Sequence, residues 1–235
     1  MKSLKERNLQ FEQIAADYDA SLPTHVVEHY TAKRTAFLRA QWDNRPARAL
    51  DVGAGTGVLA ARLQAEGWQI AGVDQARAML QVMSKRGGQA AQASSVRLPF
   101  ADNTFDVVYC VAVLHHVADP EAVRSTIREM SRVTRSGGIT VYWDHNPFNP
   151  YWPIIMARVP QDTGEERLIP EREIVAALGG LPVDITSRQT GFVGDFVPPA
   201  FLPLFQALEY CVEALPGARR VLCAHNVVVA RKRSS

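Results

Sequence analysis

Residues 49–58 read Ala49-Leu50-Asp51-Val52-Gly53-Ala54-Gly55-Thr56-Gly57-Val58, and this stretch decides the fold of the chain. It predicts a short apolar strand, a glycine-rich turn and the start of an amphipathic helix. Such a unit directs backbone N–H groups and a helix N-terminus toward a ligand. Its glycines carry no Cβ, so a ligand can come close to the main chain.

The spacing of the glycines argues against a dinucleotide as that ligand. A dinucleotide-binding turn has the pattern Gly-x-Gly-x-x-Gly, whereas Val58 stands here where the third glycine should fall. Asp51 precedes the first glycine by two residues, and its carboxylate would repel a pyrophosphate. An ammonium group would be attracted instead. The turn therefore favours a cationic or zwitterionic ligand.

Length and composition indicate one globular α/β domain. The chain has 235 residues, of which 47% are hydrophobic and 21% charged, with a net charge of +2. That charge does not indicate nucleic-acid binding, and the three cysteines show no zinc-binding spacing. We find no signal peptide and no run of 18 apolar residues. We therefore expect a cytoplasmic protein without an integral membrane segment, as a monomer or a homodimer.

The apolar pattern alternates between strands and helices, as in a doubly wound sheet. Helices are predicted before residue 45, and a tight turn at Ser136-Gly137-Gly138. One apolar helical stretch is expected over residues 199–215. Strands are predicted at 47–52, 69–74, 89–95, 105–111, 139–143, 183–190 and 224–230.

Acidic residues end the first two predicted strands. Asp51 closes the first, and Asp74 closes the second. The carboxyl ends of parallel strands meet at one edge of a sheet, where ligands bind. A carboxylate at Asp74 can accept both hydrogen bonds of a ribose diol. Together the two acids favour a ligand with a cationic head, a ribose and a base, and S-adenosylmethionine has all three parts.

The motifs together resemble the class I S-adenosylmethionine-dependent methyltransferases. Residues 50–57 resemble the first motif of that family, and an N-terminal segment from Phe11 to Asp19 resembles its ubiquinone/menaquinone type. The likeness covers about residues 10–145 and implies a Rossmann-like seven-stranded sheet in the order 3-2-1-4-5-7-6, with the last strand antiparallel and helices on both faces. Further matching segments are Gly72-Val73-Asp74, Leu98-Pro99-Phe100, Phe105-Asp106-Val107-Val108, Val113-Leu114-His115-His116-Val117 and Ser136-Gly137-Gly138.

The resemblance also implies the organisation of the chain and the residues of the cofactor site. Residues 1–45 would form a helical cap, 46–146 a cofactor-binding core, and 147–235 an acceptor-side insert with a C-terminal β-hairpin, all within one domain.

At Ser94 the family usually has an acid that meets the adenine amino group. The implied cofactor-binding residues are Tyr18, Asp51, Gly53, Ala54, Gly55, Gly57, Asp74, Gln75, Met79, Ser94, Ser95, Val96, Cys110 and Val111.

Methyl transfer requires a base only if the acceptor carries a proton. His116 follows the fourth strand, while Asp144 and His145 end the fifth, so these three are the candidate catalytic residues. A neutral histidine is a suitable base near pH 7. We expect one histidine of the His115-His116 pair to pack or to cap the following helix. We expect no metal, because the histidines form no i, i+4 pair and no Cys-x-x-Cys accompanies them.

The acceptor pocket should come from residues 144–215, of which residues 147–170 show no clear period. A small apolar or aromatic acceptor is favoured by the aromatic content, and contact with a membrane surface stays open. The nature of the accepting atom stays open too. Two alternatives remain: a different reaction with the same cofactor, and a cofactor-binding subunit without activity. The aromatic residues of this region are Trp143, Tyr151, Trp152, Phe192, Phe196, Phe201 and Phe205.

Overall fold

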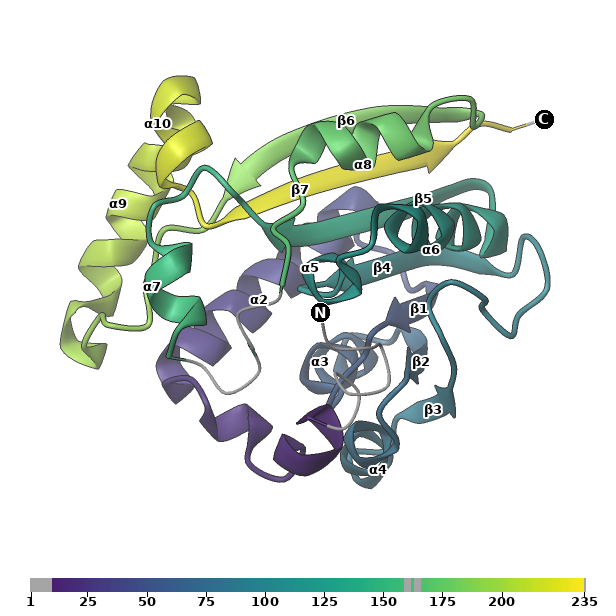
Figure 1. Cartoon of the computed structure of the whole chain (residues 1–235), viewed down its shortest axis with the longest axis horizontal. Helices are drawn as coiled ribbons and strands as arrows, with labels where there is room; N and C mark the ends of the chain where they lie inside the picture. Colours follow the sequence, from purple (N-terminus) through teal and green to yellow (C-terminus); the bar gives the residue numbers. More distant parts are fainter. Residues whose placement is uncertain (1–9, 159–161, 163–165, 235) are drawn as a thin grey trace.

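The computed structural model describes residues 10–158, 162 and 166–234 (Figure 1). One sheet holds seven strands in the order β3-β2-β1-β4-β5-β7-β6. The strands from β3 to β5 pair in parallel, and β7 pairs antiparallel with both β5 and β6. This confirms the predicted fold class and strand order. The bounds are β1 (Arg48–Val52), β2 (Gln69–Asp74), β3 (Gln89–Gln92), β4 (Phe105–Val111), β5 (Thr134–His145), β6 (Val183–Thr190) and β7 (His225–Lys232).

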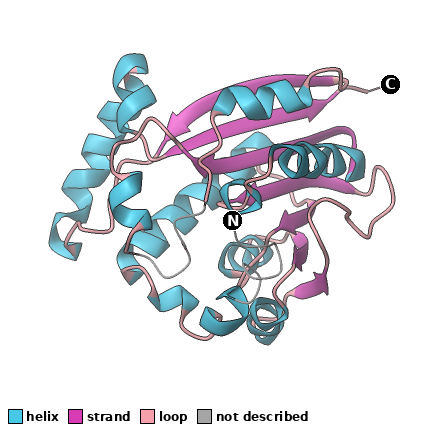
Figure 2. Cartoon of the chain, viewed as in Figure 1, coloured by secondary structure: helices cyan, strands magenta, loops and turns pink. Residues whose placement is uncertain are grey.

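Helices cover both faces of the sheet (Figure 2). One face packs against α2 (Thr24–Gln41), α3 (Val58–Ala65) and α4 (Arg77–Lys85), and the other against α6 (Pro120–Val133) and α8 (Glu171–Leu178). Successive residues of a strand point to opposite faces. In β4, Val107 and Tyr109 therefore belong to the core on the side of α2, α3 and α4. Val108 and Cys110 belong to the core on the side of α6 and α8. Both faces being covered explains why β4 is almost continuously apolar.

The fifth strand is longer than predicted. It includes the segment that we assigned to a tight turn, where Gly137 has a φ of 75°. The pairing of β4 with β5 shifts register between Phe105 and Val107. The two glycines therefore sit in a strand irregularity, which a period-based prediction cannot distinguish from a turn.

The C-terminal region places three helices beyond the ends of the strands (Figure 1). They are α7 (Trp152–Met156), α9 (Leu202–Ala214) and α10 (Pro216–Leu222), with a short 3-10 helix η2 (Pro199–Phe201) before α9. The helix predicted over 199–215 therefore begins as the 3-10 helix η2 and continues as α9. The backbone of Leu215 is extended and separates α9 from α10. The strands β6 and β7 pair with each other although α9 and α10 lie between them in the sequence.

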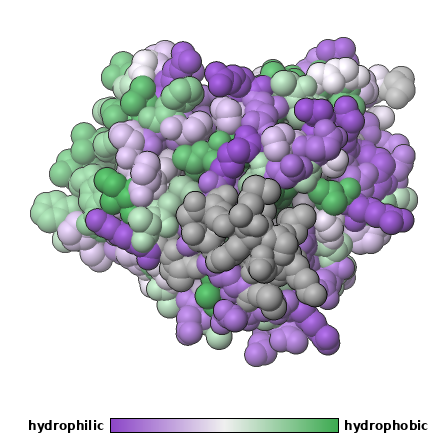
Figure 3. Space-filling view, viewed as in Figure 1, coloured by the Kyte–Doolittle hydropathy of each residue, from purple (hydrophilic) through white to green (hydrophobic). Residues whose placement is uncertain are grey.

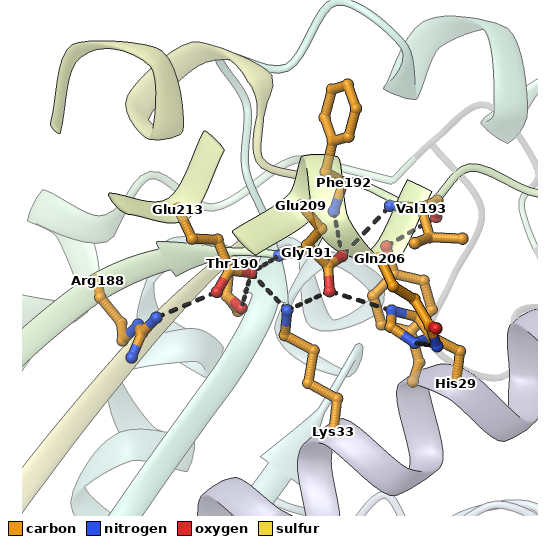
Figure 4. Close-up of polar contacts among 11 residues, drawn as sticks. His29, Lys33, Arg188, Thr190, Gly191, Phe192, Val193, Gln206, Glu209 and Glu213 are labelled. Atoms are coloured by element: carbon orange, nitrogen blue, oxygen red, sulfur yellow. Dashed lines mark hydrogen bonds and ion pairs between the residues drawn. The ribbon is translucent and has the colours of Figure 1, made fainter. Parts of the chain in front are cut away.

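A buried polar network holds α9 against α2 (Figure 4). Glu209 of α9 forms ion pairs with Lys33 and with His29, whose Nε2 lies 3.1 Å from its carboxylate. The same carboxylate accepts backbone hydrogen bonds from Phe192 and Val193. These contacts, which join distant parts of the sequence, position the segment after β6 beside α2.

Two short elements border the strand ends. The 3-10 helix η1 (Tyr18–Ala20) precedes α2, and α5 (Leu114–Val117) follows β4. Within the part of the chain that the structure describes, we find no helix long and apolar enough to cross a membrane.

Candidate functional site

The glycine-rich turn connects β1 to α3 in the geometry that its sequence predicts. Gly53, Gly55 and Gly57 have φ angles of 75°, 53° and 77°. A Cβ at Gly53 would lie 2.4 Å from Cγ2 of Val113. The Gly55 N–H donates to Asp74 at 2.9 Å, and the N–H of Ala76 donates to the other oxygen of that carboxylate. The turn thereby fixes the Asp74 carboxylate at the end of β2.

The second acid of the turn, Asp51, is buried at the end of β1. Burial, with a smaller contribution from the charge of Asp74, raises the pKa of Asp51 to about 7. Among the described residues, no cation contributes to this pKa. A bound ammonium group would supply the missing positive charge and lower the pKa.

Two cavities meet at the turn. The smaller, of about 120 Å³, is bordered by Asp74, Met79 and Ser95, and it suits a nucleoside. The larger, of about 460 Å³, is bordered by Asp51, Ala54 and residues of the C-terminal region. Both cavities are lined by Tyr18, Gly53, Gly55, Val111, Ala112 and His116.

Ten of the fourteen residues predicted to bind the cofactor line one of these cavities. The other four do not. Gly57 packs beside Met83, and Cys110 is fully buried in the core. Ser94 lies within 3.3 Å of the Gln75 amide, and Val96 is exposed. The ten are Tyr18, Asp51, Gly53, Ala54, Gly55, Asp74, Gln75, Met79, Ser95 and Val111.

The predicted catalytic residues gather around His115, which was not among them. The Nδ1 atom of His115 lies 2.7 Å from Asp144, and its Nε2 lies 3.9 Å from Asp162. Asp144 is itself held by the backbone N–H groups of Leu114 and His145, each at 2.7 Å. If Nδ1–H donates to Asp144, the Nε2 lone pair is left on the cavity side.

The electrostatic environments of the histidines differ. Burial alone lowers the pKa of His115, but the charge and hydrogen bond of Asp144, with Asp162, outweigh it and raise the pKa above its usual value. Burial and the neighbouring histidines hold the pKa of His145 well below its usual value. His145 is therefore neutral near pH 7, and His115 is the more basic of the two.

Four rings form a stack along the cavity wall. The ring centroids of His116 and His115 lie 4.0 Å apart, those of His115 and His145 4.1 Å, and those of His145 and Trp152 3.6 Å. His115 and His116 with Asp162, or His115 and His145 with Asp144, bring three donor atoms within 4.8 Å of one another. The planes of the three ring pairs are tilted by 43°, 31° and 24° in the same order, and no Cys-x-x-Cys or i, i+4 histidine pair adds to these groups. We keep the prediction of no metal.

Two residues that sequence reasoning missed also line the site. Arg34 of α2 lies over the rings of Tyr30 and Trp143. Burial lowers its pKa, its Nε has no hydrogen-bond partner, and it forms no ion pair within the described part of the chain. Its guanidinium can therefore accept an anionic group such as a carboxylate. The sequence signal that could have identified Arg34 is its position four residues after Tyr30, which places both side chains on the same side of a helix.

The other missed residue is Ala112, which follows β4. Its φ of 56° is unusual for a residue other than glycine. Its N–H donates to the Trp143 carbonyl, and it lines both cavities. Strained backbone of this kind concentrates at ligand sites, but no sequence pattern foretells it.

The far part of the larger cavity is mainly apolar. Four of the seven aromatic residues assigned to the acceptor region line it, together with Leu22, Ile155 and Leu222. Trp143 instead belongs to the core, Phe201 is exposed, and Phe205 packs beside Phe192. The four lining aromatics are Tyr151, Trp152, Phe192 and Phe196.

Fold and site together define a class of protein. The strand order with an antiparallel seventh strand, the turn between Asp51 and Asp74, and the nucleoside-sized cavity are those of the class I S-adenosylmethionine-dependent methyltransferases. A family model described as "Methyltransferase domain" matches residues 50–142.

Individual relatives agree with this assignment. A demethylmenaquinone methyltransferase of Corynebacterium urealyticum is 34% identical over 140 residues, which cover 58% of each chain. An uncharacterized methyltransferase of Mycobacterium tuberculosis is 27% identical over 95% of this chain and 89% of its own. The chain spans about half the length of the first curated relatives it matches.

Solved structures extend the likeness to the whole fold. A SAM-dependent methyltransferase of Thermotoga maritima superposes with a TM-score of 0.69 over 97% of this chain and 100% of its own, at 17% identity. The fold is therefore that of the S-adenosylmethionine-dependent methyltransferases, residues 50–142 match a methyltransferase domain, and S-adenosylmethionine is the cofactor of that family.

Proposed function

We propose that this protein transfers a methyl group from S-adenosylmethionine to a small acceptor that is mainly apolar or aromatic. The observation that supports this best is the junction of the two cavities. The nucleoside of the cofactor would fill the smaller one, and its methionine part would lie between Asp51 and Arg34. The transferred methyl group would then point into the apolar cavity, where the acceptor binds.

The chain's residues would act mainly by position. Methyl transfer is an in-line displacement at an already activated carbon, so holding the acceptor in line supplies much of the catalysis. For an acceptor with a proton to lose, we assign the base to His115, with Asp144 holding its tautomer. His116 and His145 stay as candidates for contacts with the acceptor, since both line the cavity.

The named relatives suggest which acceptors to try first. One is a demethylmenaquinone methyltransferase, and others are named for ubiquinone biosynthesis. Hydroxylated aromatic rings with an apolar substituent combine an acidic proton for His115 with a surface that fits the lining of Tyr151, Phe192 and Phe196. A panel of phenols, catechols and quinols is therefore the first set of acceptors.

The test is methyl transfer from methyl-labelled S-adenosylmethionine to this panel, followed by mass spectrometry of the products. We expect a labelled product and one S-adenosylhomocysteine per transfer. His115→Gln should lower kcat by about 100-fold or more while leaving S-adenosylhomocysteine binding intact. Cofactor bound without any turnover would favour the inactive subunit. Turnover of the acceptor without label in the product would favour a different reaction.

A further inference from the structure

The exposed apolar residues of this protein are concentrated on one region. Among the described residues, ten of the eleven exposed large apolar side chains lie between positions 148 and 222. Figure 3 shows hydrophobic surface gathered over α9 and α10. Along α9 and its ends, these residues recur at intervals of three, four and seven, which places them on one side of a helix. We call them the α9 stripe: Phe201, Leu204, Leu208 and Leu215.

The helix α9 carries apolar residues on its outward side as well as on the side that packs against the protein. Its one buried residue is Glu209, which is paired with Lys33 and His29 on α2. Glu213 also points to this side, toward Lys33 and Arg188. The inner side therefore combines two paired acidic groups with Leu202 and Phe205, which pack on the protein, while the α9 stripe faces outward. A surface helix normally buries its apolar side, so the outward side of α9 is suited to an apolar medium.

Three arginines of the C-terminal region accompany the stripe. Arg220 is exposed on α10, Arg219 is half-buried beside it, and Arg158 is exposed after α7. None of the three forms an ion pair with a residue that the structure describes. Both acidic residues of α9 are engaged on its inner side. The surface is therefore apolar and basic, which complements an anionic lipid headgroup layer. A second copy of the chain would bring like charges together.

Two further exposed apolar residues connect the region of α9 with the acceptor cavity. Phe196 and Leu222 line that cavity and are exposed. Phe196 packs edge-on against Tyr151, and against Phe205 of α9. Through the contact between Phe196 and Phe205, an exposed apolar residue of the cavity wall therefore packs directly against α9.

We propose that the α9 stripe, with Arg158, Arg219 and Arg220, docks this protein onto the surface of an anionic phospholipid membrane. The leucines and Phe201 enter the boundary between headgroups and acyl chains, and the arginines contact the phosphate groups. This inference goes beyond the proposed reaction and does not depend on it, since it concerns binding to lipid alone.

The test is flotation of the full chain with two kinds of vesicle, phosphatidylcholine alone and phosphatidylcholine with about one-third phosphatidylglycerol. We expect binding to the anionic vesicles that weakens as salt rises. A lysine or arginine near such a surface contributes about fivefold in partitioning. Arg219→Ser with Arg220→Ser should therefore weaken binding about 25-fold. Leu204→Glu with Leu208→Glu should weaken it more than tenfold.

A matched control separates this surface from net charge. Arg62→Ser with Arg128→Ser removes two exposed charges from α3 and α6, so all three double variants lose the same net charge. The control should bind vesicles as the unaltered chain does. S-adenosylhomocysteine binding should be unchanged in all three, which checks that they fold. Equal binding to both vesicles, no binding to either, or an equal loss in the control would overturn the proposal. So would a dimer in light scattering that Leu204→Glu with Leu208→Glu dissociates.

Discussion

The raised pKa of Asp51 predicts that cofactor binding depends on pH. The carboxyl group has a pKa of about 7 because it is buried without a cation. The ammonium group of S-adenosylhomocysteine binds the ionised form, so binding must release the proton from any molecule that carries one. With a pKa of 7, the dissociation constant should be about tenfold larger at pH 6 than at pH 8. Above pH 8 it should become constant.

Titration calorimetry between pH 6 and pH 8.5 measures this directly. At pH 6, experiments in buffers of different ionisation enthalpy should show about 0.9 protons released per ligand bound. Asp51→Asn keeps the shape but not the charge, and it should bind about 10- to 100-fold more weakly at pH 8 with no slope between pH 6 and pH 8. His115 and Asp162 are retained in this variant and serve as its internal control. A flat profile for the unaltered protein, or an equal slope in Asp51→Asn, would refute the reasoning.

Three further predictions test other parts of the structure. Arg34→Gln should weaken S-adenosylhomocysteine binding about 10- to 100-fold but leave 5′-methylthioadenosine, which lacks the amino-acid part, unaffected in calorimetry; equal losses for both would contradict a carboxylate contact. Gly53→Ala should lower the melting temperature more than Gly55→Ala, because both have positive φ but only the first Cβ meets another atom within 4 Å. For Glu209, His29 and Lys33 outweigh burial and lower the pKa to about 2. Its folded pKa lies below its unfolded value, so its contribution to stability is complete above about pH 4.5 and is lost as pH falls toward 2. Urea unfolding of Glu209→Gln should therefore show a smaller loss of stability between pH 5 and pH 3 than the unaltered chain.

The cofactor half of the site could be predicted because its chemistry is local. A strand, a turn and a helix that follow one another place Asp51 and the glycines without help from distant contacts. Asp74 then needs only the parallel pairing of β2 with β1. Ser94, Val96 and Cys110 were placed by likeness to a family rather than by a physical constraint, and the structure puts none of them on a cavity wall.

The acceptor half could not be predicted, because each of its contacts joins parts of the chain that are far apart in sequence. His115 was not among the candidate catalytic residues, since nothing near it in the sequence shows that the Asp144 carboxylate lies 2.7 Å away. Arg34 is one cation among many until α2 packs beside Trp143. The period of α9 predicted a helix, but not that its acidic side faces inward, because that depends on Lys33 and His29 of α2.

The two halves of the site share a physical feature that links binding to chemistry. Among the residues that the structure describes, no cation contributes to the pKa of Asp51, no anion pairs with Arg34, and His115 lies between two carboxylates. A zwitterionic cofactor would satisfy the first two at once, with its ammonium at Asp51 and its carboxylate at Arg34. Unpaired charge in a partly buried cavity is costly, so the energy of pairing these groups is available to hold the cofactor. The same pairing would exclude water from the junction of the cavities. His115 would then act on the acceptor in a drier site, where Asp144 holds its tautomer more firmly.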